Sequence, residues 1–231
     1  MATSAELAEV PRPLAAPDSP RRLREALALF LHFGSPRLLL ALLAGSLAVR
    51  LSLGGLTAWD LVPVAGLVLV WPLEEWLIHV FVLHAKPLRV FGRALDFELP
   101  RKHREHHRDP WRFDLIFIPM GSFVYSLPLL GLVWFAVTPN AALAWTGITA
   151  HLALALHYEW VHFLVHTRVV PRARYYQRLW KNHRRHHFKN EHYWFGVTML
   201  SGDRLLRTGP AHDAVPTSPT ARTLEGVGSP G

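Results

Sequence analysis

Four long apolar stretches, separated by polar segments, dominate the chain between residues 38 and 166. Each approaches the ~20 residues that an α-helix needs to cross the hydrocarbon core of a bilayer. They lack the polar stripe that a surface helix of a soluble protein carries. The pattern therefore predicts an all-α, multi-pass integral membrane protein with about four transmembrane helices, over residues 38–57, 61–83, 116–137 and 141–166.

The second stretch is interrupted by Glu74 and Glu75, so only residues 61–73 are continuously apolar. A carboxylate in the middle of a bilayer is costly. We therefore expect the last turns of this stretch to lie at the membrane interface.

The basic residues support the same topology. Five Lys or Arg residues precede Leu38, eight lie between Lys86 and Arg112, and eleven follow from Arg168, while Arg50 is the exception. The short connections between the first and second stretches and between the third and fourth carry none. The positive-inside rule then places both termini and the long middle connection in the cytoplasm.

The ends of the chain have a different composition. Pro11, Pro13, Pro17 and Pro20 stand among small and acidic residues, with no cleaved signal peptide visible. We expect residues 1–36 to be a partly disordered cytoplasmic tail, 37–209 to be the membrane domain, and 210–231 to be a disordered tail.

Composition narrows the chemistry. The chain has no cysteine, which excludes disulfides, thiolate nucleophiles and sulfur-ligated clusters, so any metal must be bound by nitrogen and oxygen. The net charge of +8 comes from basic residues interleaved with apolar runs. That distribution favours a membrane surface over nucleic acid as the partner.

Ten of the fifteen histidines fall in four spaced clusters, and the form H-x-x-H-H occurs twice. Positions i, i+3 and i+4 of a helix share a face, so each H-x-x-H-H can direct three imidazoles to one region. Ten imidazoles exceed what one ion can bind, which predicts a dinuclear site. The candidate ligands and catalytic residues are His79, His84, His103, His106, His107, His162, His166, His183, His186 and His187.

The pair His79 and His84 has the spacing i, i+5, which on a regular helix separates two side chains by about 140°. The two can reach a common centre only near a helix end or between two metals. The predicted topology brings all ten histidines to the cytoplasmic face, where we expect a histidine-rich helical cap. His32, His151 and His212 lie outside the clusters and are expected to have no part in the site.

Acidic and histidine residues beside the clusters are candidates for supporting the ligands. Glu75 lies one helical turn before His79, and Glu159 lies three residues before His162. A carboxylate so placed can accept the second ring N–H of an imidazole and fix its tautomer. The further candidates in this outer layer are His157, His192 and Asp203.

Two rival interpretations apply to these clusters. Basic runs such as HRRHH can bind lipid phosphate, which accounts for the arginines but not for the repeated histidine spacing. A membrane metal-binding or transport protein would place polar ligands along the spans rather than at their ends. All-nitrogen ligation by itself leaves iron, zinc and copper open, although zinc cannot reduce O2.

With these motifs, the chain resembles the fatty acid hydroxylase superfamily, which includes sterol desaturases and fatty acid 2-hydroxylases. The superfamily's forms H-x4-H, H-x2-HH, H-x3-H and H-x2-HH match this chain between Glu74 and Gly209. The segments HREHHRDPWRFDLIFIP and HRRHHFKNEHYWFGVTMLSGDRLLRTGP look most like the fatty acid 2-hydroxylases. The chain departs from that group at Glu159, where aspartate is usual, and at His192.

The resemblance implies an O2-dependent monooxygenase with two Fe ions held by the ten histidines, for which Zn can substitute on purification. Its substrate would be a lipid or fatty acyl chain, hydroxylated at C2. Residues 1–37 are too short for the cytochrome b5 domain that some members carry, so we expect a separate cytochrome b5-like or ferredoxin-like electron donor. Lipid, sterol or carotenoid desaturases and hydroxylases of the same superfamily remain alternatives.

Overall fold

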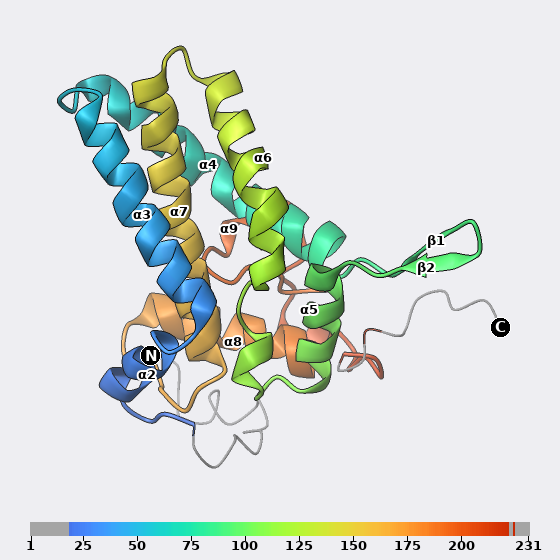
Figure 1. Ribbon diagram of the computed structural model, residues 1–231. Helices are drawn as coiled ribbons and strands as arrows, with labels where there is room; N and C mark the ends of the chain where they lie inside the picture. The colour runs from blue at the N-terminus through green and yellow to red at the C-terminus, as the bar shows by residue number, and fades with distance from the viewer. Residues whose placement is uncertain (1–18, 222–223, 225–231) are drawn as a thin grey trace.

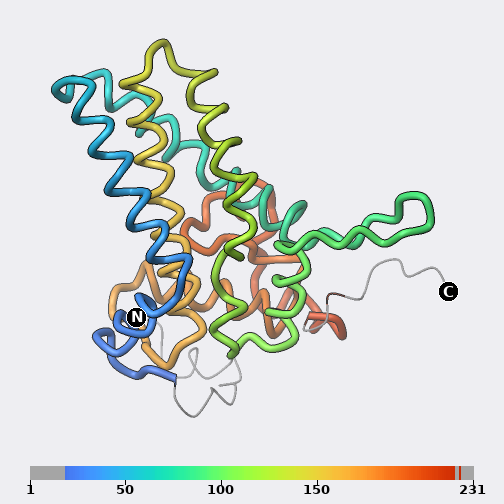
Figure 2. The backbone as a smooth tube through the Cα atoms, viewed as in Figure 1, coloured from blue at the N-terminus to red at the C-terminus, as the bar shows by residue number. Residues whose placement is uncertain are grey.

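The computed structural model describes residues 19–221 and Leu224. Four long helices form a bundle, in which α7 contacts each of the other three (Figures 1 and 2). They are α3 (Gly34–Ser52), α4 (Leu61–Leu77), α6 (Phe123–Val137) and α7 (Ala141–Val165). The fold is therefore helical and of the membrane type that the apolar pattern predicted.

The core of the bundle lies where α7 meets its neighbours. Leu39, Trp71, Trp134 and Leu152 are buried there. A Cβ at Gly147 would collide with the ring of Trp134, so the glycine permits the close approach of α6 and α7.

Three segments are long and apolar enough to span a membrane: Gly34–Ser52, Ala58–Leu83 and Phe113–Val137. The fourth expected span, α7, is not among these three candidates in the described chain. Two of its polar side chains contact neighbouring elements of the fold. Thr149 donates to Ser46 in α3, and Thr146 donates to Asp60 in the short helix η1 (Ala58–Asp60).

The one basic residue outside the three basic segments is neutralised inside the fold. Arg50, 3% exposed, donates to both carboxylate oxygens of Asp60 at 2.8 and 2.7 Å. Its Nε also donates to Thr146 at 2.8 Å. A paired guanidinium of this kind ties the ends of α3, η1 and α7 together, with both charges buried.

The third apolar stretch is helical over only part of its predicted length. The short helix η3 (Phe113–Leu115) precedes it, η4 (Met120–Ser122) lies within it, and α6 begins only at Phe123. Pro119 stands between the two short helices, and proline disfavours helical backbone in the residue before it. The backbone near Ile116 is thereby left free to make contacts with side chains.

A cap of shorter elements covers one end of the bundle (Figure 1). The π-helix η2 (Ile78–Leu83) continues α4, and α5 (Glu98–Arg108) and α8 (Arg174–Phe188) lie beneath it. A hairpin of β1 (Leu88–Val90) and β2 (Arg93–Leu95) projects from the side. The remaining cap helices are α9 (Ser201–Leu205) and η5 (His212–Ala214).

The two predicted tails are partly described. Helix α2 (Leu23–Phe30) buries Ala26 and Phe30 against Phe117 and Phe163, while residues 1–18 lie outside the described part. Residues 210–221 lie against the cap, where Ser218 donates its backbone N–H to Lys189 at 2.8 Å. The rest of the predicted C-terminal tail, apart from Leu224, is outside the described residues, and the domain division stays a prediction.

Candidate metal centre

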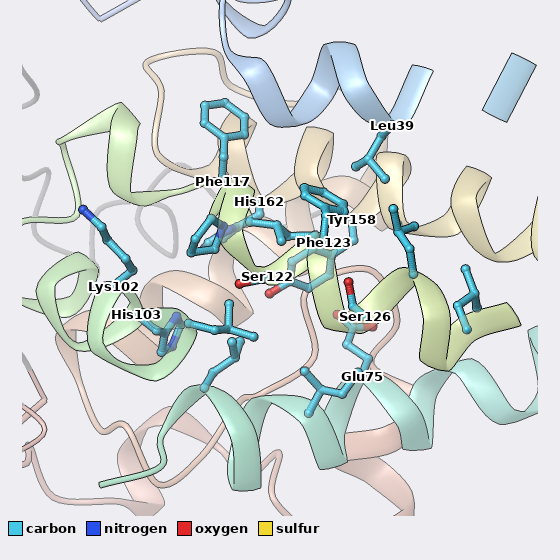
Figure 3. A pocket seen from close by; sticks show the side chains of 18 of the residues that line it. Leu39, Glu75, Lys102, His103, Phe117, Ser122, Phe123, Ser126, Tyr158 and His162 are labelled. Carbon is cyan, nitrogen blue, oxygen red and sulfur yellow. The ribbon is translucent and has the colours of Figure 1, made fainter. Parts of the chain in front are cut away.

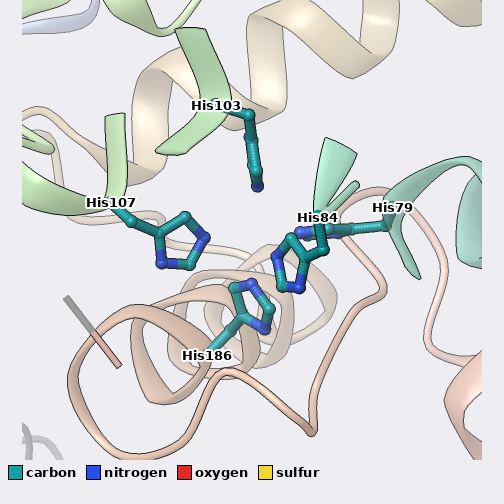
Figure 4. A group of neighbouring side chains, drawn as sticks. All are labelled: His79, His84, His103, His107 and His186. Carbon is teal, nitrogen blue, oxygen red and sulfur yellow. The ribbon is translucent and has the colours of Figure 1, made fainter. Parts of the chain in front are cut away.

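The ten predicted histidines lie together beneath the bundle in two neighbouring groups, each of which can bring five ring nitrogens within 4.8 Å of one another. The first group consists of His79, His84, His103, His107 and His186, whose rings converge on one region (Figure 4). The second consists of His106, His162, His166, His183 and His187. The ten predicted residues therefore form one continuous cluster of two groups, each of which could hold a metal ion.

Each H-x-x-H-H motif is divided between the two groups. In α5, His103 and His107 belong to the first group and His106 to the second. In α8, His183 and His187 belong to the second group and His186 to the first. Since each residue advances 100° around a helix, i and i+4 point about 40° apart, whereas i+3 and i+4 point about 100° apart. The motif therefore presents two imidazoles to one group and one to its neighbour.

The H-x4-H pair reaches one centre through a local change of helix type. The N–H of His84 donates to the carbonyl of His79 at 3.2 Å, an i to i+5 bond of a π-helix. The wider turn brings the two rings to a centroid separation of 5.0 Å, both in the first group. Of the two arrangements that the spacing allowed, the chain uses the helix end rather than a bridge between two metals.

Backbone carbonyls fix the ring orientation of four histidines. The Nδ1 atoms of His79 and His107 lie 2.7 and 2.9 Å from the carbonyl oxygens of Phe195 and Ala221. His162 and His186 make the same contact with Ile116 and Tyr193, at 3.1 and 2.8 Å. Because a carbonyl only accepts, Nδ1 carries the hydrogen and Nε2 is left as a lone-pair ligand facing the centre.

The free nitrogen atoms at these centres fit a bound cation. Among the described residues, the buried Nε2 atoms of His79, His84, His103, His107, His162 and His186 have no hydrogen-bond partner. The Nε2 atoms of His183 and His187 approach each other to 3.0 Å. Buried polar atoms are rarely left without a partner, so this concentration of lone pairs fits metal ions and not a hydrogen-bonded core.

Burial keeps the histidines of the cap in the form that binds metal. Desolvation lowers the pKa of His107 to about 3, although its hydrogen bond to Ala221 acts in the opposite direction. Burial followed by repulsion from neighbouring imidazoles also lowers the pKa of His103 and His187 well below the ordinary value. Neutral imidazole is the ligand form, so no proton has to be displaced at neutral pH.

Glu75 supports His79 through a loop and not by direct contact. Its carboxylate accepts the N–H groups of Val197 and Thr198 at 2.5 and 2.7 Å, and the Thr198 hydroxyl at 2.8 Å. The same loop contains Phe195, whose carbonyl accepts the His79 ring. The predicted hydrogen bond between Glu75 and the His79 ring is therefore wrong. Glu75 instead holds the loop whose Phe195 carbonyl orients that ring.

Glu159 repeats this arrangement on the other side of the site. It accepts the Ser35 hydroxyl at 2.5 Å and the N–H of Ile118 at 2.8 Å, and Ile116 in the same turn accepts the His162 ring. The predicted direct contact between Glu159 and an imidazole is therefore also replaced by a contact with the backbone.

A third carboxylate follows the same pattern. Glu191, 2% exposed, accepts the Thr220 hydroxyl at 2.6 Å, next to the Ala221 carbonyl that receives the His107 ring. Glu191 was not predicted from the sequence, because its partner lies 29 positions later in a segment predicted to be disordered.

Asp203 is a buried anchor of the same loop that Glu75 holds. It accepts the N–H groups of Phe195 and Gly196 at 3.0 and 2.9 Å, and the side-chain amide of Asn182 at 3.1 Å. Asn182 also donates to the Gly196 carbonyl at 2.8 Å. Asn182 was not predicted, and its position directly before His183 was the available indication.

Other histidines near the clusters lie outside both groups. His157 is half-buried against Tyr176, and His192 is exposed beside Glu191, with 3.5 Å between His192 Nε2 and a carboxylate oxygen. Their role in an outer layer stays a prediction. His151 lies 3.2 Å from a carboxylate oxygen of Glu74, within the bundle.

The arginines of HRRHH contact aromatic side chains of the cap. Arg184 is 6% exposed, and its guanidinium lies 4.2 Å from the centre of the Trp180 ring and 5.5 Å from that of Trp111. Desolvation lowers its pKa to about 10. Arg185 lies 5.9 Å from the ring centre of Trp194. These cation–π contacts hold α8 in place and leave the histidines as the chemically available part of the motif.

An apolar cavity of about 240 Å³ leads from the bundle to the histidines. His103 and His162, one from each group, lie at one end and Leu39 lies at the other (Figure 3). Its walls come from α4, α6, α7 and the segment of η3 and η4, and they include Leu115, Phe117, Phe123, Leu127, Leu130 and Leu152. A cavity of this shape and chemistry fits an extended hydrocarbon chain with one end at the metal ligands.

Comparisons with known proteins point in the same direction. Residues 64–208 match the model of the family described as fatty acid hydroxylase. The dihydroceramide fatty acyl 2-hydroxylase FAH1 of Arabidopsis thaliana is 25% identical over 210 residues, which cover 89% of this chain and 86% of the relative. FAH2 from the same plant is 28% identical over 143 residues, 62% of this chain and 58% of the relative.

Two further comparisons involve a fungal relative. The ceramide very long chain fatty acid hydroxylase SCS7 of Saccharomyces cerevisiae is 31% identical over 151 residues, 64% of this chain but only 38% of the relative. A solved structure of full-length scs7p, in which only the hydroxylase domain is visible, superposes with a TM-score of 0.65 at 23% identity. The superposition covers 80% of this chain and 68% of that chain, which establishes a shared fold.

Proposed function

The chain belongs to the fatty acid hydroxylase family, and we propose that it is a membrane enzyme that hydroxylates a lipid acyl chain, at C2, with O2. The names of its relatives support this choice, since they are fatty acyl 2-hydroxylases and a ceramide fatty acid hydroxylase. The observation that carries the proposal is the apolar cavity that ends at His103 and His162, because it joins a site for hydrocarbon to both metal centres.

The ten histidines would hold two metal ions, which we propose to be iron. The metal pair, when bound, would supply the reduction of O2, with one oxygen atom entering a C–H bond and the other leaving as water, at the cost of two electrons and two protons. A separate cytochrome b5-like or ferredoxin-like protein would deliver those electrons. Zinc can occupy the same nitrogen ligands on purification but cannot accept or donate electrons in this reaction.

The chain's own residues have two tasks in this reaction. Phe123 and Leu152, with the other apolar walls, would orient the acyl chain and exclude water from the reacting carbon. The carbonyls of Phe195, Ala221 and Ile116 would hold the ligand rings in position, so that binding a metal requires little rearrangement.

We also propose that α7 is a fourth transmembrane helix and that both termini and the metal centres face the cytoplasm. Its 25 residues correspond to about 37 Å of helix, enough to cross a bilayer. Its contacts with α3, α4 and α6 support a position inside the bundle. The basic residues in the cap and the paired Arg50 at the opposite end support the orientation.

Lipid analysis in a host that lacks endogenous 2-hydroxylated lipids tests the proposed reaction. Cells expressing the full chain should accumulate 2-hydroxy acyl lipids, and chains with His103→Ala or His162→Ala should produce none at matched protein levels. His32→Ala is the matched control because His32 is exposed and outside both groups. Accumulation of unsaturated or sterol products in place of 2-hydroxy lipids would reject the proposed outcome and favour the desaturase alternative.

A further inference from the structure

The β1–β2 hairpin is an apolar projection that nothing in the described part of the chain covers. Leu88, Val90 and Leu95 are 56%, 39% and 47% exposed, and Phe91 at the tip is fully exposed. Leu88 pairs with Leu95, and paired residues share one face of an antiparallel ladder. An isolated two-stranded hairpin is only marginally stable in water, so an apolar hairpin of this kind needs a surface to lie against.

The turn of the hairpin holds an aromatic side chain outward in a strained backbone conformation. Val90 pairs with Arg93, so the loop consists of Phe91 and Gly92, with φ of 48° and 75°. Positive φ at both positions matches a type I′ turn, in which asparagine or glycine is preferred at the first position. Phenylalanine has neither the small size nor the hydrogen-bonding group that suits this conformation. Its presence there favours a role for the exposed ring.

The charge on the hairpin indicates the chemistry of the surface. Lys86, Arg89 and Arg93 are exposed along it. Its one acidic residue, Asp96, is bonded to Arg104 at 2.5 Å. Exposed cations around an apolar, aromatic tip complement a bilayer interface, where acyl chains lie beside phosphate groups and anionic lipids attract basic residues.

The position of the hairpin is consistent with that surface. The candidate span Ala58–Leu83 ends five residues before β1, and Phe81 near its end is 64% exposed. The hairpin leaves the body at this point and extends sideways from the bundle (Figure 1). Arg104 in α5 fixes its base, since it donates to the carbonyl of Ala85 as well as to Asp96, both at 2.5 Å.

We propose that this hairpin lies in the headgroup region of the same membrane, with the Phe91 ring inserted among the acyl chains and the basic side chains at the phosphates. The proposal requires that the chain is an integral membrane protein, and it is independent of the reaction and of the metal. Because Arg104 lies next to His103 in α5, the contact also fixes the height of the metal ligands relative to the bilayer surface.

Site-specific fluorescence in the full-length protein tests the contact. The chain has no cysteine, so Phe91→Cys provides a single attachment point for an environment-sensitive fluorophore. The control is Thr217→Cys, an exposed position in the segment that packs on the cap near Lys189. Each labelled protein would be placed singly in lipid nanodiscs, and its emission measured with aqueous iodide and with nitroxide-labelled phospholipid.

The fluorophore at position 91 should show a blue-shifted emission, a severalfold smaller iodide quenching constant than at position 217, and strong quenching by the nitroxide lipid. In discs containing phosphatidylserine, adding Arg89→Gln and Arg93→Gln should increase iodide quenching at position 91. Equal iodide quenching at the two positions would overturn the proposal. Shielding that develops only after an electron-donor protein is added, or only in discs with two chains, would also overturn it in favour of a protein interface.

Discussion

Replacing Glu75 tests whether a buried carboxylate holds a metal ligand through the intervening backbone. In Glu75→Ala, the buried N–H groups of Val197 and Thr198 lose their acceptor. Each orphaned donor costs about 1–3 kcal/mol, so the free energy of unfolding should fall by about 2–6 kcal/mol. Glu75→Gln keeps an acceptor oxygen in place and loses only the assistance of the charge, so its loss should be smaller.

The affinities of the two metal ions should also change in Glu75→Ala. They should change unequally, which a general loss of stability would not cause. Freeing the loop loosens the Phe195 carbonyl, which orients His79 in the first group. Loss of such an outer contact typically weakens metal binding about 10–100-fold. Glu75→Ala should therefore release one of its two metals more readily than the other, and Glu159→Ala, which acts on His162, should weaken the opposite centre.

Chelator titration with elemental analysis measures the loss of each of the two metal ions. The titration is carried out on purified protein in detergent or nanodiscs. Glu74→Gln is the matched control, since Glu74 adjoins Glu75 in the same helix but contacts His151 and not the loop. If Glu75→Ala retains metal as tightly as Glu74→Gln does, or loses both ions in parallel, the proposed link from carboxylate to loop to imidazole is wrong.

Three further predictions concern the ligands, the topology and the response to acid. His107→Ala and His187→Ala should each abolish product formation in cells at matched protein levels, whereas His212→Ala should leave it near the parent level; full activity in both ligand variants would exclude the repeated motif as the metal site. Tags at the amino terminus, near Arg93 and after Gly209 should all be inaccessible to reagents outside intact cells, and external labelling near Arg93 would break the topology. Burial lowers the pKa of His107 from its ordinary 6.5 to about 3. As the pH falls, His107 is therefore protonated in the unfolded chain before it is protonated in the folded one. His107 alone should then lower the stability of metal-free protein by about 1.4 kcal/mol per unit as the pH falls from 6.5 towards 3, and denaturant unfolding that is no weaker at pH 5 than at pH 7 would contradict this.

The grouping of the ten candidate ligands could be predicted from the sequence because it depends on local spacing. The i, i+3 and i+4 positions around His103 and His183 place side chains by helix geometry alone, and the structure brings all ten histidines together. The long helices were likewise predictable. The apolar runs that begin at Gly131 and Leu152 contain no polar face, so they must lie in a protein core or in lipid. The family motifs added the expected chemistry.

Contacts to the backbone could not be predicted from the sequence. The acceptors for His79 and His107 are carbonyls of Phe195 and Ala221, which any residue type supplies equally. The same limit explains why Glu75 was predicted to bind an imidazole, since the amides that it accepts lie 122 and 123 residues away. The number of spans was difficult for a related reason: Thr149 lowers the apolar character of α7, yet its hydroxyl faces Ser46.

The division of each H-x-x-H-H motif between two centres has a consequence for assembly. Each ion would bridge α5 and α8, which are separated by more than sixty residues and follow different membrane hairpins. Metal binding would then close a long loop and lock the two halves of the protein together, with the binding energy contributing to folding. Because each of the two ions would by itself connect α5 with α8, a chain that holds a single ion should already have its two halves joined.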